Sequence, residues 1–118
     1  AWHSSPEKYA KNLSKIIELL KDNGGKIVWA NTTPIPENDP NRPEGDELIY
    51  NAAAAKVMKQ HNIQTNDLHG VVTRWEGYAQ WKQGNDVHFP GAVYSKLAQQ
   101  VAAVITAHLE LQKKPSKK

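Results

Sequence analysis

Apolar residues recur at helical spacing in three stretches of this chain. Ser5 and Pro6 are typical of a helix start, because a serine hydroxyl caps the first turn and proline fits its first position. The residues that follow predict a helix that ends at the run from Asn23 to Gly25. Two further helices are predicted, an alanine-rich one over residues 46–61 and a last one over residues 90–109. The predicted buried face of the first helix consists of Tyr9, Leu13, Ile16, Ile17 and Leu20, and that of the last helix of Val93, Leu97, Val101, Val104 and Ile105.

Between these helices lie two runs that resemble strands. Residues 26–30 are apolar on both faces, as in a buried parallel strand, and residues 62–64 are a weaker candidate. A proline-rich polar loop over residues 32–45 follows the first strand, and residues 67–78 predict a short helix broken at one of its glycines. This alternation predicts an α/β fold with a parallel sheet. Because two parallel strands leave their edges and faces open, we expect the chain to be part of a larger doubly wound domain.

Composition and charge narrow the classes of function. Hydrophobic residues make up 39% of the 118 residues and charged residues 23%, which is typical of one globular domain or part of one. Cysteine is absent, which excludes disulfides, thiolate chemistry and cysteine-based zinc sites. The net charge of +3 becomes −1 without the four lysines near the C-terminus (3 − 4 = −1). We therefore predict a domain over residues 1–112 and a disordered Lys-rich tail over residues 113–118, with no face for nucleic acid. A chain that begins at Ala1 without an initiator methionine is typical of a processed or truncated protein.

Asp86 and His88 stand two residues apart, just ahead of the last predicted helix. In an extended segment, residues i and i+2 point to the same side, so the carboxylate can reach the imidazole ring. A carboxylate that holds one ring nitrogen leaves the other free to take a proton from a nucleophile. The pair is two-thirds of a hydrolase triad; the alternative is a surface pair that only caps the last helix.

Other histidines and aromatic residues carry weaker signals. His61 and His69 are eight residues apart, which is not the spacing of a metal-ligand pair, so we predict no metal site. His61 is expected to interact with the dipole at a helix C-terminus, and His69 to be partly exposed. Trp75, Tyr78 and Trp81 form a strip at positions i, i+3 and i+6. This strip predicts either packing against the sheet or a wall beside the site that stacks on a sugar ring.

Several short runs stand in a specific order along the chain: residues 9–13, 27–36, 50–54, 66–68 and 86–89, the last followed by a helix. Together they resemble the second half of an SGNH (GDSL-type) hydrolase domain, and they span nearly the whole chain before the Lys-rich tail. The fold of that family is a three-layer α/β/α, flavodoxin-like arrangement around about five parallel strands. Its activity is serine ester hydrolysis. The resemblance therefore implies that this chain covers the C-terminal part of such a domain.

The resemblance also implies roles for individual residues. The catalytic Asp and His of the family lie together in the last of these runs, so His88 would be the general base and Asp86 its orienter. Many members carry the Asp three residues before the His, where this chain has Asn85, which leaves Asn85 as a second, uncharged candidate orienter. The nucleophilic Ser of the family, and the Gly and Asn of its oxyanion hole, belong to motifs that have no counterpart here. None of the serines near the predicted helices has the strand-to-helix context of that nucleophile: Ser4, Ser5, Ser14 and Ser95.

Two classes of function follow. The first is the C-terminal part of a serine esterase that cleaves acyl or acetyl esters, acylated carbohydrates among them, with the nucleophilic Ser outside this chain. It needs no metal or organic cofactor, and its partners are the substrate and the missing N-terminal half, with no nucleic acid or membrane. The alternative is a non-catalytic binding module that keeps the fold, which the missing nucleophile and Asn85 favour. A carboxylate-based hydrolase that pairs Asp86 with Asp67 or Glu76 has no support in the spacing.

Overall fold

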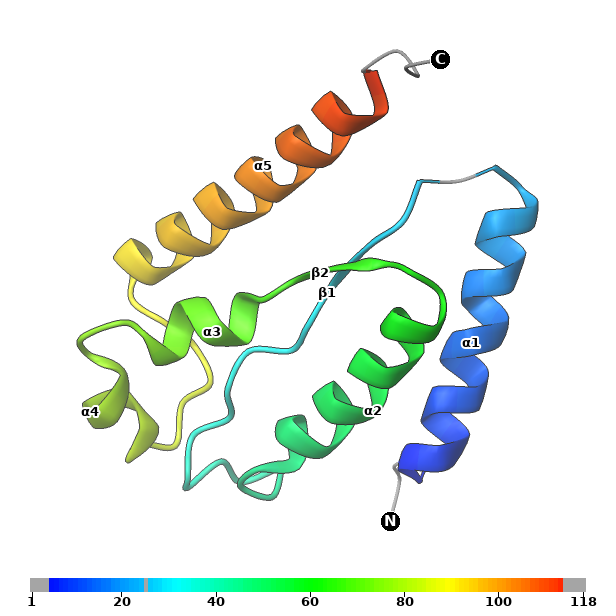
Figure 1. Cartoon of the computed structure of the whole chain (residues 1–118). Helices are drawn as coiled ribbons and strands as arrows, with labels where there is room; N and C mark the ends of the chain where they lie inside the picture. Colours follow the sequence, from blue (N-terminus) through cyan, green and yellow to red (C-terminus); the bar gives the residue numbers. More distant parts are fainter. Residues whose placement is uncertain (1–4, 25, 114–118) are drawn as a thin grey trace.

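Two short parallel strands lie among five helices in a computed structural model that describes residues 5–24 and 26–113, the side chains of 111–113 excepted (Figure 1). Strand β1 (Val28–Ala30) pairs in parallel with strand β2 (Gln64–Asn66), with Val28 opposite Gln64 and Ala30 opposite Asn66. The chain is therefore a mixed α/β structure with a parallel pair of strands, as the sequence predicts. In chain order the elements are α1 (Pro6–Asp22), β1 (Val28–Ala30), α2 (Asp46–Gln60), β2 (Gln64–Asn66), α3 (Leu68–Thr73), α4 (Tyr78–Lys82) and α5 (Gly91–Lys113).

The ends of the first two helices follow their local sequence signals. The Ser5 hydroxyl accepts a hydrogen bond from the Lys8 amide at 3.2 Å, which caps α1 at its N-terminus. The helix ends at Asp22, and Asn23 is its C-terminal cap. Helix α2 begins at Asp46 and ends one residue before His61. These bounds confirm the predicted ones to within a residue.

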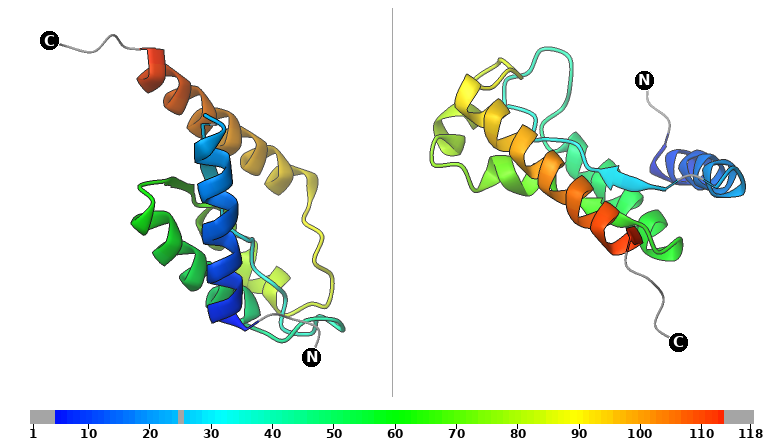
Figure 2. Two further views of the ribbon diagram at one scale, coloured as in Figure 1. Left: turned by 90° about the vertical axis from the view of Figure 1, so that its right-hand side faces the viewer. Right: turned by 90° about the horizontal axis from the view of Figure 1, so that it is seen from above.

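The main core lies between α1, α2 and one side of the strands. Figures 1 and 2 show α1 and α2 side by side on that side, with α5 on the other. Helix α5 packs mainly against α3 and β2, where Val72 and Val93 are fully buried. The core cluster consists of Leu13, Ile17, Ala54, Val57 and Met58, with Tyr9, Ala10, Ile27, Trp29 and Ile63 packed against it.

Three sequence expectations need correction. Ile16, Leu20 and Ile105 belong to predicted buried faces but are exposed. The second strand begins at Gln64 rather than at position 62, because Asn62 adopts a left-handed conformation (φ 57°) that turns the chain out of α2. The helix predicted over residues 67–78 is broken at Gly77, one of its glycines, as expected, but its second part, α4, runs on to Lys82 instead of ending at residue 78.

The described part of the chain is open rather than closely packed. Its radius of gyration is 16.4 Å, whereas a compact domain of this length has about 13.5 Å. Neither strand has a partner on its outer edge among the described residues. Of the predicted Lys-rich tail, residue 113 belongs to α5 and residues 114–118 lie outside the described residues. Within the described ranges, no helix is both long and apolar enough to cross a membrane.

Candidate active site

Asp86 and His88, the two predicted site residues, contact each other directly. His88 Nδ1 lies 2.6 Å from Asp86 Oδ1, and the His88 main-chain amide donates a hydrogen bond to the same oxygen at 3.0 Å. Asn85, the other candidate orienter, is exposed and makes no hydrogen bond to His88 in the part of the chain that the structure describes. Of the two, Asp86 is therefore the residue that holds the ring.

The charge on Asp86 decides which ring nitrogen carries a proton. Two hydrogen bonds hold the pKa of the Asp86 carboxyl below its ordinary value: the larger effect comes from the His88 amide and the smaller from the His88 ring. The ionised carboxylate can only accept hydrogen bonds, so His88 Nδ1 must donate, and in the neutral imidazole Nε2 then keeps its lone pair. No described residue forms a hydrogen bond with Nε2. The atom that would act as a base is thus open to a group from outside.

The Asp86–His88 pair is too exposed to contribute much to the stability of the fold. The His88 side chain is 78% exposed and that of Asp86 is 70% exposed. An exposed ion pair contributes little to the free energy of unfolding, because water and salt screen it. The pair also borders an open hollow of about 450 Å³, which is lined further by Gln80, Trp81, Gly84, Asn85, Phe89 and Pro90.

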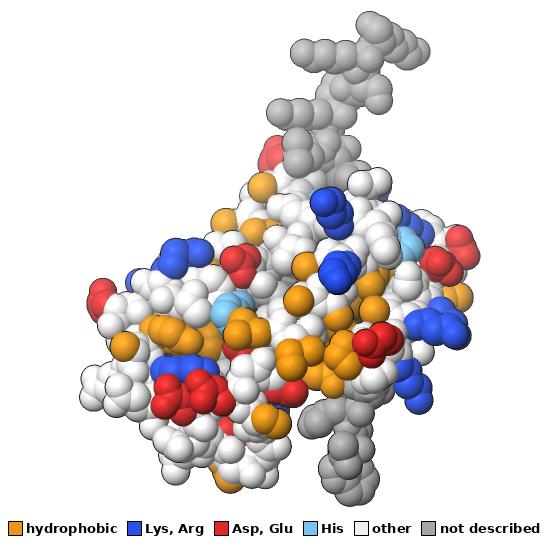
Figure 3. Space-filling model, turned by 60° about the horizontal axis from the view of Figure 1, so that its bottom comes forward, with side chains coloured by type: hydrophobic (Ala, Val, Ile, Leu, Met, Phe, Trp, Pro, Cys, Tyr) orange, Lys and Arg blue, Asp and Glu red, His pale blue; other side chains and the backbone are white. Residues whose placement is uncertain are grey.

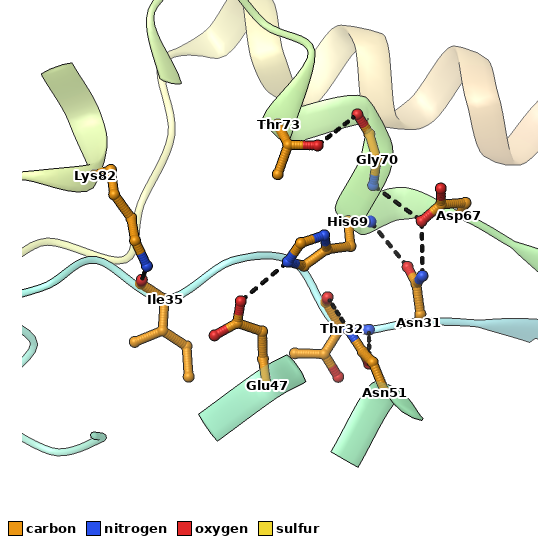
Figure 4. Close-up of polar contacts among 10 residues, drawn as sticks. All are labelled: Asn31, Thr32, Ile35, Glu47, Asn51, Asp67, His69, Gly70, Thr73 and Lys82. Carbon is orange, nitrogen blue, oxygen red and sulfur yellow. Dashed lines mark hydrogen bonds and ion pairs between the residues drawn. The ribbon is translucent and has the colours of Figure 1, made fainter. Parts of the chain in front are cut away.

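The proline-rich loop after β1 supports the segment that leads into this pair. The Glu37 amide donates to the Lys82 carbonyl at 2.8 Å, and the Asn38 amide donates to the Gly84 carbonyl at 3.1 Å. The Lys82 ammonium donates to the carbonyl of buried Ile35 at 2.6 Å, as Figure 4 shows. Main-chain bonds to this loop, which is buried at residues 34–36, therefore fix the turn after α4, from which the site segment starts.

A second polar cluster, at the carboxyl ends of the two strands, was not predicted from the sequence (Figure 4). The side-chain amide of Asn31, just after β1, donates to Asp67 Oδ1 at 2.8 Å and accepts from the His69 amide at 2.8 Å. Asp67 Oδ1 also accepts from the Gly70 amide at 3.0 Å, which caps α3. These bonds tie the ends of β1 and β2 to the start of α3.

Buried Glu47 pairs with His69 next to that cluster. His69 Nε2 lies 3.0 Å from Glu47 Oε2; the His69 side chain is 19% exposed and that of Glu47 is 2% exposed. The other carboxylate oxygen of Glu47 is buried and has no partner among the described residues. The prediction that His69 is partly exposed is therefore confirmed. Neither position alone gives a signal, because the two are 22 residues apart in the sequence.

Asn51 holds the main chain at the start of the proline-rich loop. Its side-chain oxygen accepts from the Thr32 amide at 3.0 Å, and its side-chain nitrogen donates to the Thr32 carbonyl at 2.9 Å (Figure 4). An amide side chain that bonds both main-chain groups of one residue replaces the partner that a neighbouring strand would supply. Asn51 therefore fixes the direction in which the chain leaves β1.

Removing the Asp67 cap should destabilise the fold at neutral pH. Asp67→Ala deletes the acceptor of the Gly70 and Asn31 hydrogen bonds, and we expect the free energy of unfolding to fall by about 1 kcal/mol. Urea unfolding followed by circular dichroism measures this change. Asp22→Ala, at the exposed C-terminal end of α1, is the matched control and should change the free energy by less than about 0.5 kcal/mol.

The effect of Asp67 should depend on pH in one direction. Hydrogen bonds from Asn31 and then from Gly70 hold the pKa of Asp67 below its ordinary value of 3.8. The contribution of the Asp67 carboxylate to the free energy of unfolding is therefore complete above about pH 4, and it is lost as the pH falls through the pKa of Asp67 in the folded chain. The difference in unfolding free energy between the native chain and Asp67→Ala should shrink below about pH 4. An unchanged difference at pH 3 would contradict the charged cap.

None of the described serines forms a hydrogen bond with His88. Ser14 is the one described serine whose hydroxyl contacts a histidine ring, and that ring is His61, at 2.7 Å from Nε2. Ser14 lies in the middle of α1, across the sheet from the segment that carries His88 (Figure 1). His61 is the C-terminal cap of α2, as expected, so this contact joins two helices rather than building a triad. Ser4 lies outside the described residues.

The predicted aromatic strip does not form one surface. Trp75 falls in the turn between α3 and α4 and borders a hollow with Arg74 and Lys96. Trp81 instead stacks near Tyr78, at a centroid distance of 6.2 Å, and close to Phe89, at 4.7 Å. The turn between α3 and α4 separates Trp75 from Tyr78 and Trp81. Only Trp81 of the strip borders the hollow beside His88.

No protein-family model matches this chain, and no curated protein matches it. The geometry of the residues themselves therefore has to carry any assignment of function.

Proposed function

We propose that this chain supplies the general base and its orienter to a serine ester hydrolase of the SGNH type. His88 is the base and Asp86 is the orienter, and the nucleophilic serine comes from outside this chain. The observation that carries the proposal is the 2.6 Å contact between Asp86 Oδ1 and His88 Nδ1, with Nε2 facing no partner of the described chain. An alcohol nucleophile needs a base that takes its proton. An imidazole that is held by a carboxylate at one ring nitrogen and is unoccupied at the other can serve as that base.

The reaction proceeds in two halves. In the first, His88 Nε2 takes the proton of the serine hydroxyl as its oxygen attacks the ester carbonyl, and the resulting imidazolium then gives that proton to the departing alcohol. In the second, His88 takes a proton from water, the hydroxide attacks the acyl-enzyme, and the proton returns to the serine oxygen as the acid leaves. Asp86 stays ionised throughout and stabilises the imidazolium. Its lowered pKa is consistent with that role.

The rest of the domain would complete the sheet and bring the nucleophile. Both outer strand edges lack a partner in the described chain, and parallel sheets are normally covered on both faces. Several large apolar residues of α1 and α5 are exposed, including Leu19 and Leu109. Figure 3 shows apolar side chains gathered across the middle of one face, with charged side chains around them. These features fit the C-terminal part of a three-layer α/β/α, flavodoxin-like domain.

We further propose acyl or acetyl esters as substrates, with acylated carbohydrates among them. The hollow beside His88 combines the side-chain amides of Gln80 and Asn85 with the aromatic rings of Trp81 and Phe89. Amides bond to hydroxyl groups and aromatic rings pack on the apolar face of a sugar. The hollow is open, so an ester on a larger alcohol can reach Nε2.

A fluorophosphonate probe, which labels activated serines, tests the proposal. The segment that carries the nucleophile, assembled with this chain, should be labelled on one serine, and His88→Ala should abolish the labelling. The 118-residue chain alone should not be labelled, and Ser14→Ala serves as the matched control in both experiments. Labelling that persists in His88→Ala would overturn the assignment of the base. No labelling in the assembled domain would favour a non-catalytic binding module with the same fold.

A further inference from the structure

Trp81 contacts the main chain of His88 directly. Its indole Nε1–H donates a hydrogen bond to the His88 carbonyl at 2.9 Å. Its ring also packs close to that of the next residue, Phe89, with centroids 4.7 Å apart and planes inclined by 32°. The site residue and its neighbour are therefore both in contact with one side chain of α4.

The position of the His88 ring depends on its main chain. The segment from Gly84 to Pro90 has no regular secondary structure, and the His88 side chain is largely exposed. The main-chain amide of His88 is bonded to Asp86 and its carbonyl to Trp81, so one bond holds each side of the residue. If the carbonyl were released, the peptide could rotate, and the ring could leave the Asp86 carboxylate.

Trp81 is itself well anchored. It precedes Lys82, whose carbonyl accepts from the Glu37 amide at 2.8 Å and whose ammonium donates to the carbonyl of buried Ile35. On the other side, the Tyr94 hydroxyl of α5 accepts from the Phe89 amide at 3.2 Å, and the two rings meet edge to face at 5.8 Å. The segment around His88 is thus held between α4 and α5.

We infer that Trp81 is a positioning residue for His88. The indole N–H of Trp81 bonds the His88 carbonyl and so keeps the His88 ring in contact with the Asp86 carboxylate. This inference rests on the proposed function, because a positioned base matters only if His88 takes part in catalysis. Its role differs from that of a substrate contact, although the Trp81 ring also borders the hollow. The hydrogen bond and the ring surface can be separated by substitution.

Trp81→Phe keeps an aromatic ring against Phe89 and removes the N–H donor. In the assembled hydrolase we expect kcat to fall about 3- to 10-fold with KM nearly unchanged, because the base is misplaced and substrate binding is not. Trp75→Phe is the matched control: Trp75 lies in the turn between α3 and α4 and does not line the hollow beside His88, so its replacement should leave kcat unchanged. An unchanged kcat in Trp81→Phe, or a loss that arises from KM alone, would overturn the inference.

Nitrogen NMR of the His88 ring tests the same inference without catalysis. In the ¹⁵N-labelled 118-residue chain, the ring should be the Nδ1–H tautomer, and Trp81→Phe should shift it toward a mixture of both tautomers. If Trp81→Phe does not fold, benzothienylalanine at position 81 keeps the shape of the indole and lacks the donor. A tautomer that stays unchanged in the folded variant would overturn positioning. This measurement needs no nucleophile, so a failure of the positioning role can be told apart from a failure of the proposed function. If the proposed function is wrong, the His88→Ala variant of the assembled domain stays active, whatever the ring NMR shows.

Discussion

If the proposed function is right, His88→Ala should lower ester turnover by the assembled domain by about four to six orders of magnitude. The substitution removes the group that is proposed to take the serine proton. The Asp86 carboxylate is a poor replacement, because its lowered pKa makes it a weak base. Steady-state hydrolysis of an acetyl ester with a chromogenic alcohol measures the loss, and kcat should fall while KM changes little.

Two companion variants separate catalysis from folding. His108→Ala, in α5, removes a histidine that has no part in the proposed site and should leave kcat unchanged. Asp86→Asn keeps the size of the side chain but removes the charge, and it can stabilise the wrong tautomer of His88, so we expect a loss of about 10⁴ in kcat. Turnover at the native rate in either His88→Ala or Asp86→Asn would exclude the proposed mechanism.

Ile17→Ala should lower the free energy of unfolding of the 118-residue chain by about 2–5 kcal/mol. The Ile17 side chain is 2% exposed and packs in the cluster between α1 and α2, where Val57 and Met58 also lie. Its truncation would remove apolar contacts and leave a cavity that the two helices cannot fully close. Urea unfolding of both proteins, followed by circular dichroism, measures the difference.

The neighbouring residue supplies the matched control. Ile16 is 53% exposed, so Ile16→Ala should change the unfolding free energy of the same chain by less than about 0.5 kcal/mol. Equal losses for Ile16→Ala and Ile17→Ala would mean that the outer face of α1 is covered in solution. In the assembled domain, by contrast, a larger effect of Ile16→Ala would locate the face on which the remaining elements pack.

Local chemistry made parts of this structure predictable. Ser5 and Pro6 begin α1 because the hydroxyl bonds a free amide of the first turn and the ring already has the helical φ. The Asp86–His88 contact was predictable for the same reason, since two residues of one extended segment need no other element to meet. The choice between Asn85 and Asp86 required the structure, because both are close enough along the chain to reach the ring.

Contacts between distant segments could not be predicted in this way. The burial of Glu47 against His69 joins α2 to α3, and the bond from Trp81 to His88 depends on the break between α3 and α4. Ile16 and Ile17 differ by about 100° around the helix, so both fit one broad apolar face, and only the position of α2 buries one of them.

The sequence by itself therefore determined the α/β class, the order of the helices and strands apart from α4, and the Asp86–His88 pair, because spacing, caps and short-range contacts act within a few residues. Only the tertiary structure decided which apolar residues are buried, where β2 begins and which side chains hold the His88 segment. Those features depend on where one element lies against another, and free energies of packing depend on that placement rather than on the local sequence.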